Sequence, residues 1–251
     1  MKREWSALIF AMTFPTLMTW FYFVVLARPI SLTPIESISR TPGNPGAQAA
    51  YAIGKVIQFS FPLLFVVIFE PSRLRPGRPN FKGIGMGIGF GLLVGAGMAA
   101  LYLAGLQSWL AGTGAATMIR IKIEEFSASS PIRYAALASF LTVAHSLLEE
   151  YYWRWFVFGR LRRLVTFPTA VALSSVAFMA HHVIVLGRFF PNDFWSAVVP
   201  LSLCIAAGGA FWAWLYERSG SVYAPWVSHL LVDVVVLAVG YDLVFGEVGS
   251  R

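Results

Sequence analysis

Residues Ile84 to Leu106 read IGMGIGFGLLVGAGMAALYLAGL and contain no charged side chain. A helix needs about 20 predominantly apolar residues to cross the hydrocarbon core of a bilayer, so this stretch is long enough to span a membrane. Seven such runs recur along the chain, which predicts an all-α fold, a polytopic bundle of about seven transmembrane helices. The runs are Trp5–Ala27, Ala50–Phe69, Ile84–Leu106, Ile132–Phe156, Thr169–Leu186, Phe194–Tyr216 and Val222–Val244.

The composition of the 251 residues agrees with a membrane protein. Hydrophobic residues make up 57% of the chain and charged residues 12%, against roughly 45–50% and about 25% in soluble domains. A soluble enzyme, a disordered tail and a disulfide-stapled secreted domain are thereby excluded. The single cysteine, Cys204, forms no internal bridge and is interpreted as a small buried apolar residue. We expect one integral membrane domain over residues 1–251.

The distribution of basic residues predicts the topology. The net charge of +7 comes from residues between the apolar runs, a pattern of membrane orientation and not of a nucleic-acid-binding face. We therefore expect the lipid bilayer and no nucleic acid as partner. Ten basic residues fall on the side predicted to be cytoplasmic: Lys2, Arg3, Arg73, Arg75, Arg78, Lys82, Arg160, Arg162, Arg163 and Arg218. Seven fall on the other side: Arg28, Arg40, Arg120, Lys122, Arg133, Arg188 and Arg251.

This bias places the N-terminus inside and the C-terminus outside, in a multi-pass protein of a prokaryotic cytoplasmic membrane. The first run exceeds the about 7–15 apolar residues of a signal peptide, so we interpret it as a retained anchor. The mixed segment Ala111–Phe126 leaves two alternatives open. It forms an eighth spanning helix, which would reverse the orientation of the N-terminal half, or it lies on the interface.

Titratable residues inside apolar runs mark functional sites or buried pairs, because they are costly in hydrocarbon. Eight of the nine lie in the C-terminal half of the chain, which places a candidate site between the C-terminal helices. The nine are Lys55, His145, Glu149, Glu150, Arg154, His181, His182, His229 and Asp233. Lys55 is expected to snorkel along its run to the interface.

Glu149 is the most informative of these residues. Glu150 and Arg154 are four positions apart and share a helical face, so an intramembrane ion pair accounts for both. Glu149 is rotated about 100° from Glu150 and has no obvious local cation. A desolvated carboxylate without a partner suits a general acid or base. His145, one turn earlier, either tunes this carboxylate or simply hydrogen-bonds to it.

The histidines add two further polar positions. His181 and His182 point to different faces of their helix, so only one of them faces a shared centre. The spacing from Phe178 to His182 places the aromatic ring beside that imidazole. His229 and Asp233 also share a face, either as a structural hydrogen bond or as an imidazole aimed at a developing charge. One carboxylate and two histidines on three helices provide the groups for activating water inside a membrane.

These motifs resemble the CPBP family, the CAAX prenyl proteases and bacteriocin-processing proteins, which are intramembrane endopeptidases of glutamate type. The motifs are Glu-Glu-x-x-x-Arg at 149–154, Phe-x-x-x-His at 178–182 and His-x-x-x-Asn/Asp at 229–233. The segment Ser219–Pro225 before the third motif also looks typical. The resemblance covers residues 132–244, less than half of the chain.

The resemblance implies a role for each motif residue. Glu149 activates water together with His182, while Glu150, Arg154, Phe178 and His181 support the site. His229 and the residue four positions later stabilise the oxyanion. This chain has Asp233 where Asn is commonest, and an ionised carboxylate cannot donate a hydrogen bond. We expect Asp233 to accept from His229, or to donate if it is protonated.

The resemblance favours a mechanism without metal. Zinc remains an alternative, because one Glu and two His make a legitimate zinc set, although no two histidines are spaced i and i+4. The leading hypothesis is an endopeptidase that acts on a membrane-associated protein or peptide near its terminus. The alternatives are a non-catalytic scaffold or immunity protein of the same fold and a proton-coupled transporter. We expect the site on the cytoplasmic side of the midplane.

Overall fold

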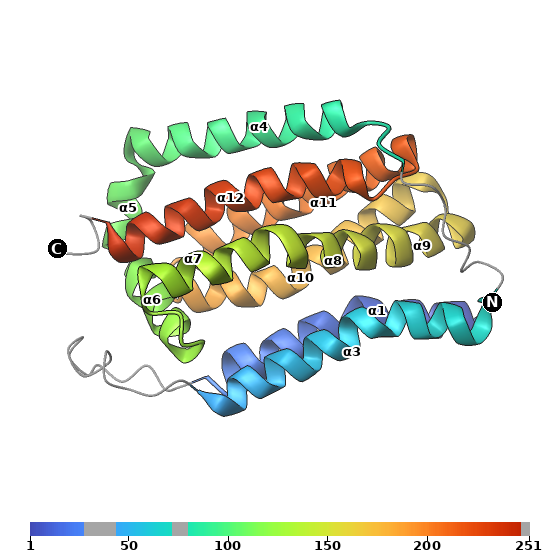
Figure 1. The fold of residues 1–251 in the computed structure, drawn as a ribbon, viewed down its shortest axis with the longest axis horizontal. Coiled ribbons are helices and arrows are strands. Elements are labelled where there is room, and N and C mark those ends of the chain that lie inside the picture. The colour runs from blue at the N-terminus through green and yellow to red at the C-terminus, as the bar shows by residue number, and fades with distance from the viewer. Residues whose placement is uncertain (28–43, 72–79, 247–251) are drawn as a thin grey trace.

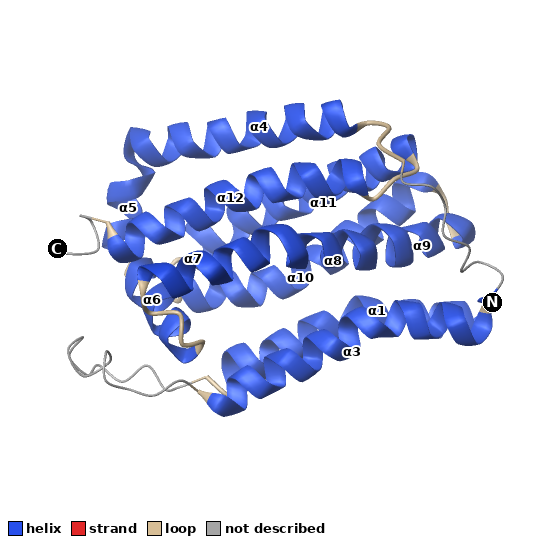
Figure 2. Cartoon of the chain, in the orientation of Figure 1, coloured by secondary structure: helices blue, strands red, loops and turns tan. Residues whose placement is uncertain are grey.

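The computed structural model describes residues 1–27, 44–71 and 80–246, and every regular element in these ranges is a helix (Figure 2). The basic residues of the topology count at 28, 40, 73, 75, 78 and 251 lie outside the described residues. Most long helices are extended by stretches with π-helical hydrogen bonding, labelled η. The predicted all-α class is confirmed.

The N-terminal half begins with α1 (Lys2–Trp20), which η1 (Phe21–Val25) continues. The next described helix is α3 (Pro45–Phe69). Next come α4 (Ile84–Leu101), η3 (Tyr102–Leu106), α5 (Gln107–Gly112) and α6 (Ala115–Glu125). One continuous helical segment then runs through α7 (Pro131–Phe140), η4 (Leu141–His145), α8 (Ser146–Glu150), η5 (Tyr151–Phe158) and α9 (Gly159–Leu164). The last three long helices are α10 (Phe167–Phe189), η6 with α11 (Phe194–Val198 and Val199–Ser219) and α12 (Tyr223–Phe245).

Six helices of the described residues are long and apolar enough to cross a membrane, so the chain is an integral, multi-pass membrane protein. This number is one lower than the predicted seven, because the run Ile132–Phe156 is not among the six helices. That run is helical, but Glu149, Glu150 and Arg154 lower its apolar character. An eighth spanning helix at Ala111–Phe126 is wrong. Only 11 residues form α6, about 16 Å at 1.5 Å per residue, against a hydrocarbon core of about 30 Å.

Successive long helices run antiparallel, with the start of α1 and the end of α12 at opposite ends of the bundle (Figure 1). Counting α7–α9 as one segment, the described helices pass along the bundle seven times, as the seven predicted runs require. The end of the bundle at which α1 starts also holds the start of α4, all of α9 and the end of α11 (Figure 1). These elements or the residues beside them carry the described basic residues that the topology assigned to one side: Lys2, Arg3, Lys82, Arg160, Arg162, Arg163 and Arg218. Which membrane face this end occupies, and the prokaryotic origin, stay predictions.

A glycine stripe holds α4 close against α12. Gly87, Gly91 and Gly95 are buried in this contact. A Cβ atom added to Gly87 would lie 2.3 Å from the backbone oxygen of Ala224, and one added to Gly91 would lie 2.9 Å from that of Ser228. Small residues allow helix backbones to approach in this way in membranes. Because α12 also contacts α8, the stripe fixes α12 between two neighbours.

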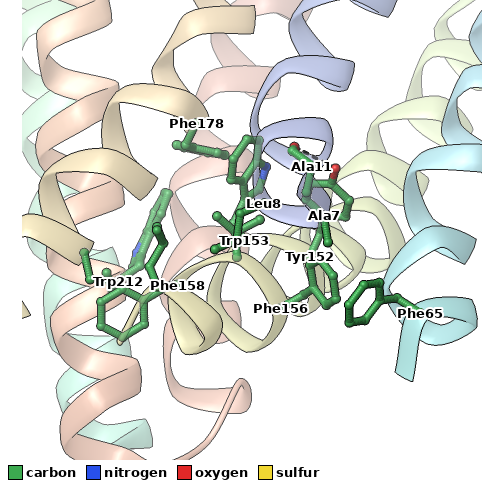
Figure 3. Close-up of a cluster of buried hydrophobic side chains, with 14 residues drawn as sticks. Ala7, Leu8, Ala11, Phe65, Tyr152, Trp153, Phe156, Phe158, Phe178 and Trp212 are labelled. Atoms are coloured by element: carbon green, nitrogen blue, oxygen red, sulfur yellow. Dashed lines mark hydrogen bonds between the residues drawn. The ribbon is translucent and has the colours of Figure 1, made fainter. Parts of the chain in front are cut away.

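An aromatic cluster joins the N-terminal helices to the C-terminal half (Figure 3). Leu8 of α1 and Phe65 of α3 belong to the same buried cluster as Trp153 and Trp212. At the N-terminal end of the bundle, buried Arg160 of α9 adds ion pairs to Glu4 at 2.7 Å and Glu70 at 3.1 Å. These contacts fasten α1 and α3 to the segment that carries Glu149.

Candidate active site

Glu149 and Glu150 end the five-residue α8, which lies between the π-helical stretches η4 and η5. Such irregular turns inside helices occur frequently at functional sites. Both carboxylates are buried, Glu149 with 5% and Glu150 with 0% of its surface exposed. The helix therefore presents two adjacent carboxylates to the interior of the bundle, where each needs compensating partners.

Three histidines from three parts of the chain surround the Glu149 carboxylate. His145 Nε2 lies 3.4 Å and His181 Nε2 lies 3.8 Å from Glu149 Oε1. His229 Nε2 lies 3.8 Å from Glu149 Oε2. His145 is the neighbour one turn earlier that the sequence already offered, whereas His181 and His229 come from α10 and α12, so tertiary packing supplies two imidazoles that local spacing does not reveal.

The second carboxylate, that of Glu150, contacts two basic side chains. Arg154 Nε lies 3.0 Å from Glu150 Oε2, which confirms the predicted ion pair. His229 Nδ1 lies 2.8 Å from Glu150 Oε1, in the geometry of an N–H group donating to a carboxylate. The Arg154 guanidinium lies over the ring of Trp212, 5.3 Å from its centre. Glu150 is therefore a fixed acceptor between the two helices.

His229 is held on several sides. Its ring stacks on Trp212, with centroids 4.2 Å apart and an angle of 20° between the planes. Trp212 in turn donates from its indole nitrogen to Ser228 Oγ at 3.0 Å. His229 Nε2 lies 3.6 Å from Asp233 Oδ1, so the predicted shared face is confirmed. With Nδ1 directed to Glu150, the Nε2 atom is the one that faces both Glu149 and Asp233.

His181 and His182 take different positions, as their adjacent places in α10 require. His181 is the one within ion-pair distance of Glu149. His182 Nδ1 donates to the backbone oxygen of Phe178 at 3.0 Å, and its ring lies 4.8 Å from the Phe178 ring, as the spacing predicts. This hydrogen bond leaves His182 Nε2 as the free ring nitrogen of the neutral imidazole. The role of His182 in water activation stays a prediction.

The site residues lie at different depths in their helices. Glu149 is 15 residues from Leu164, the end of its helical segment, or about 22 Å. His229 is only six residues from Tyr223, the start of α12 and the neighbouring end of the bundle, or about 9 Å. Their 3.8 Å contact shows that the helices are staggered or tilted. The membrane side of the site remains a prediction.

The mechanism without metal stays a prediction. Within residues 1–27, 44–71 and 80–246, no group of three or more His, Cys, Asp or Glu side chains has the geometry to hold a metal ion.

Two contributors to the site could not be found from motif spacing. Trp212 has no titratable group and lies in the predicted run Phe194–Tyr216 among other aromatic residues. Only the packing of α11 on α12 shows that it supports His229. Lys55, on α3, interacts electrostatically with Glu149 although it lies in the N-terminal half. The sequence indicated Lys55 only by placing a charged residue inside an apolar run.

The fold and site define a multi-pass membrane protein whose helices enclose a carboxylate and its histidines. Residues 131–235 match the model of a known family, described as type II CAAX prenyl endopeptidase Rce1-like. The match spans all three motifs and confirms the resemblance predicted from them. The match supports a peptidase that is embedded in the bilayer. A membrane-associated peptide as substrate is consistent with such a protein. Comparison with curated proteins and with solved structures finds no match.

Proposed function

We propose that this protein is a glutamate-type intramembrane endopeptidase that hydrolyses a peptide bond in a membrane-associated protein or peptide. The observation that carries the proposal is the buried Glu149 carboxylate, with imidazole nitrogens of His145, His181 and His229 within 4 Å. A carboxylate held among imidazoles away from bulk water can accept a proton from water and pass it on.

In the proposed reaction, Glu149 and His182 orient the attacking water. A water proton moves to Glu149 while the oxygen forms a bond to the carbonyl carbon of the substrate. The carbonyl oxygen becomes an oxyanion, and an N–H group at His229 Nε2 stabilises it. The same proton is then delivered to the leaving nitrogen as the C–N bond breaks. The products are a carboxylic acid and an amine, and Glu149 is regenerated as a carboxylate.

Glu150 and Asp233 support the oxyanion donor. The hydrogen bond from Nδ1 to Glu150 fixes the orientation of the His229 ring, and a carboxylate at each side of that ring favours its protonated form. A protonated ring carries a hydrogen on Nε2, which is the atom available to substrate. Arg154 holds Glu150 in place through their ion pair. No step of this mechanism uses a metal.

The test is cleavage of a candidate membrane peptide by the wild type and by Glu149→Gln in reconstituted vesicles, with and without a chelator. Gln keeps the size of the side chain but cannot act as a base. Glu217→Gln is the matched control, because it removes a carboxylate from a surface ion pair at the end of α11. We expect activity to persist in the control and in chelator, and to be lost in Glu149→Gln.

Other outcomes identify the alternatives. Cleavage that survives Glu149→Gln contradicts the assignment of the base. A cellular function that survives in a strain carrying Glu149→Gln indicates a non-catalytic scaffold or immunity role. Activity that disappears in chelator and returns with zinc contradicts the mechanism without metal.

A further inference from the structure

Lys55 carries an ammonium group near mid-depth of the bundle. It lies ten residues after Pro45 and fourteen before Phe69, the ends of α3, or about 15 Å and 21 Å along the helix. Its Nζ donates to Gln58 Oε1 at 3.2 Å, between the rings of Tyr51 and Phe59 at 5.8 Å and 5.4 Å. The predicted snorkelling to the interface is wrong, since these contacts hold the ammonium at this depth.

The charge of the half-buried Lys55 has no paired carboxylate, unlike the three buried cations Lys122, Arg154 and Arg160. Arg154 pairs with Glu150, Arg160 with Glu4 and Glu70, and Lys122 with Glu125. Among the described residues, no carboxylate lies within the 4.0 Å of an ion pair from Lys55 Nζ. An unpaired cation in hydrocarbon is costly and marks a functional position by default.

Gln58 adds a second unused donor at the same place. Its side chain is 2% exposed, and its Oε1 atom accepts from Lys55. Its Nε2 atom is buried and has no hydrogen-bond partner in the part of the chain that the structure describes. Buried amide donors are rarely left without a partner. An ammonium and an amide N–H₂ side by side form a cradle for an anionic, planar acceptor such as a carboxylate.

This cradle faces the candidate active site. The Phe59 ring meets the His145 ring edge-on at 5.6 Å, and His145 contacts Glu149 Oε1. Lys55 interacts electrostatically with Glu149, His145 and His181, so its charge is felt at the candidate active site. The oxyanion donor His229 contacts the other oxygen, Oε2. A peptide bound between these groups can place one end at Lys55 while its scissile carbonyl faces His229.

We propose that Lys55 and Gln58 form a substrate subsite that binds a carboxylate close to the scissile bond. The carboxylate is either the C-terminal α-carboxylate of the substrate or an Asp or Glu side chain. This inference rests on the proposed function and specifies its substrate class. It also gives α3, outside the matched residues 131–235, a part in specificity.

The experiment compares three internally quenched farnesylated peptides that differ only at the C-terminus. The first ends in a free carboxylate, the second in a carboxamide, and the third in a carboxamide with Asp as its last residue. Cleavage gives kcat/KM for each peptide, and binding to Glu149→Gln in nanodiscs gives each affinity without turnover. The variants are Lys55→Met, Lys55→Arg and Gln58→Leu, with the exposed Lys82→Met as control for the loss of a charge.

We expect the wild type and Lys82→Met to prefer a carboxylate over the plain carboxamide by roughly tenfold or more, mainly through KM. Lys55→Met should remove this preference, Gln58→Leu should weaken it, and Lys55→Arg should keep most of it. Preference for the first peptide identifies the α-carboxylate as the ligand, and preference for the third identifies an acidic side chain.

Equal kcat/KM values of the wild type for the three peptides, or equal affinities for them, overturn the subsite. A preference for a carboxylate that persists in Lys55→Met also overturns it. Failure to bind any of the peptides has the same meaning. These results are separate from a failure of the proposed function, which appears as cleavage by Glu149→Gln.

Discussion

His229 and Glu150 are joined by a 2.8 Å hydrogen bond between Nδ1 and Oε1, although 79 positions separate them in the chain. The bond connects α12 to α8 and brings His229 Nε2 to face Glu149. Arg154 completes the arrangement by pairing with the other oxygen of Glu150. One carboxylate thus positions an imidazole and neutralises a buried guanidinium.

We expect Glu150→Gln to impair both activity and stability. The amide can still accept from His229, but it leaves the buried Arg154 without a counter-charge, which costs about 3 kcal/mol or more. A less firmly held His229 should lower kcat by roughly tenfold to a hundredfold. Peptide cleavage in vesicles and thermal unfolding in detergent measure the two effects. Wild-type values for both would contradict the role given to Glu150.

His182→Gln and His181→Gln should separate the two neighbouring histidines. Loss of a positioned acid–base group lowers kcat by about 10² to 10⁴, which we expect for His182→Gln. His181→Gln loses the 3.8 Å contact to Glu149 and should lower kcat by roughly tenfold. The comparison uses kcat and KM in vesicles. The reverse order of the two effects would transfer the water-activating role to His181.

Asp233→Asn should retain activity within about tenfold of wild type, because an amide fits beside His229 and can donate to an oxyanion. Asp233→Leu removes every polar atom 3.6 Å from His229 Nε2 and should lower kcat/KM by about 10². The two variants are compared on one peptide under identical conditions. An Asn variant as poor as the Leu variant would show that the carboxylate charge is required.

Gly91→Ala should loosen the packing that positions His229. The new Cβ would lie 2.9 Å from both Ser228 O and Leu231 Cβ, so α12 has to shift. Overpacking of this kind costs about 1–3 kcal/mol, and we expect lower thermal stability together with lower kcat. Gly89→Ala is the matched control on the same helix, since its Cβ meets nothing within 4 Å. Equal behaviour of the two variants would contradict this role of the stripe.

Arg160→Leu should destabilise the protein far more than Arg162→Leu. The Arg160 side chain is 3% exposed and pairs with Glu4 and Glu70, so its loss breaks two ion pairs at once and costs about 3 kcal/mol or more. The pair of Arg162 with Glu217 is 29% and 40% exposed and contributes at most about 1 kcal/mol. Thermal unfolding in detergent compares them, and similar losses would rule out a clamp at Arg160.

The sequence by itself determined the class of fold and the local pairs of the site. Apolar runs of about 20 residues can satisfy their backbone hydrogen bonds in lipid only as helices or closed barrels, and their length indicates helices. Helical periodicity then fixes contacts four residues apart, which is why the pairs Glu150–Arg154, Phe178–His182 and His229–Asp233 were predictable. The charged residues that mark the site also lower the apolar character of the predicted run Ile132–Phe156, which is not among the six helices apolar enough to span a membrane.

Only the tertiary structure decided which groups meet between helices. The placing of His181 and His229 beside Glu149, the bond from His229 to Glu150, the stacking on Trp212 and the approach of Lys55 all join different helices. Their geometry depends on the tilt, stagger and separation of the helices. Those quantities are set by the fit of glycines and aromatic rings over whole interfaces, so no single motif or spacing encodes them.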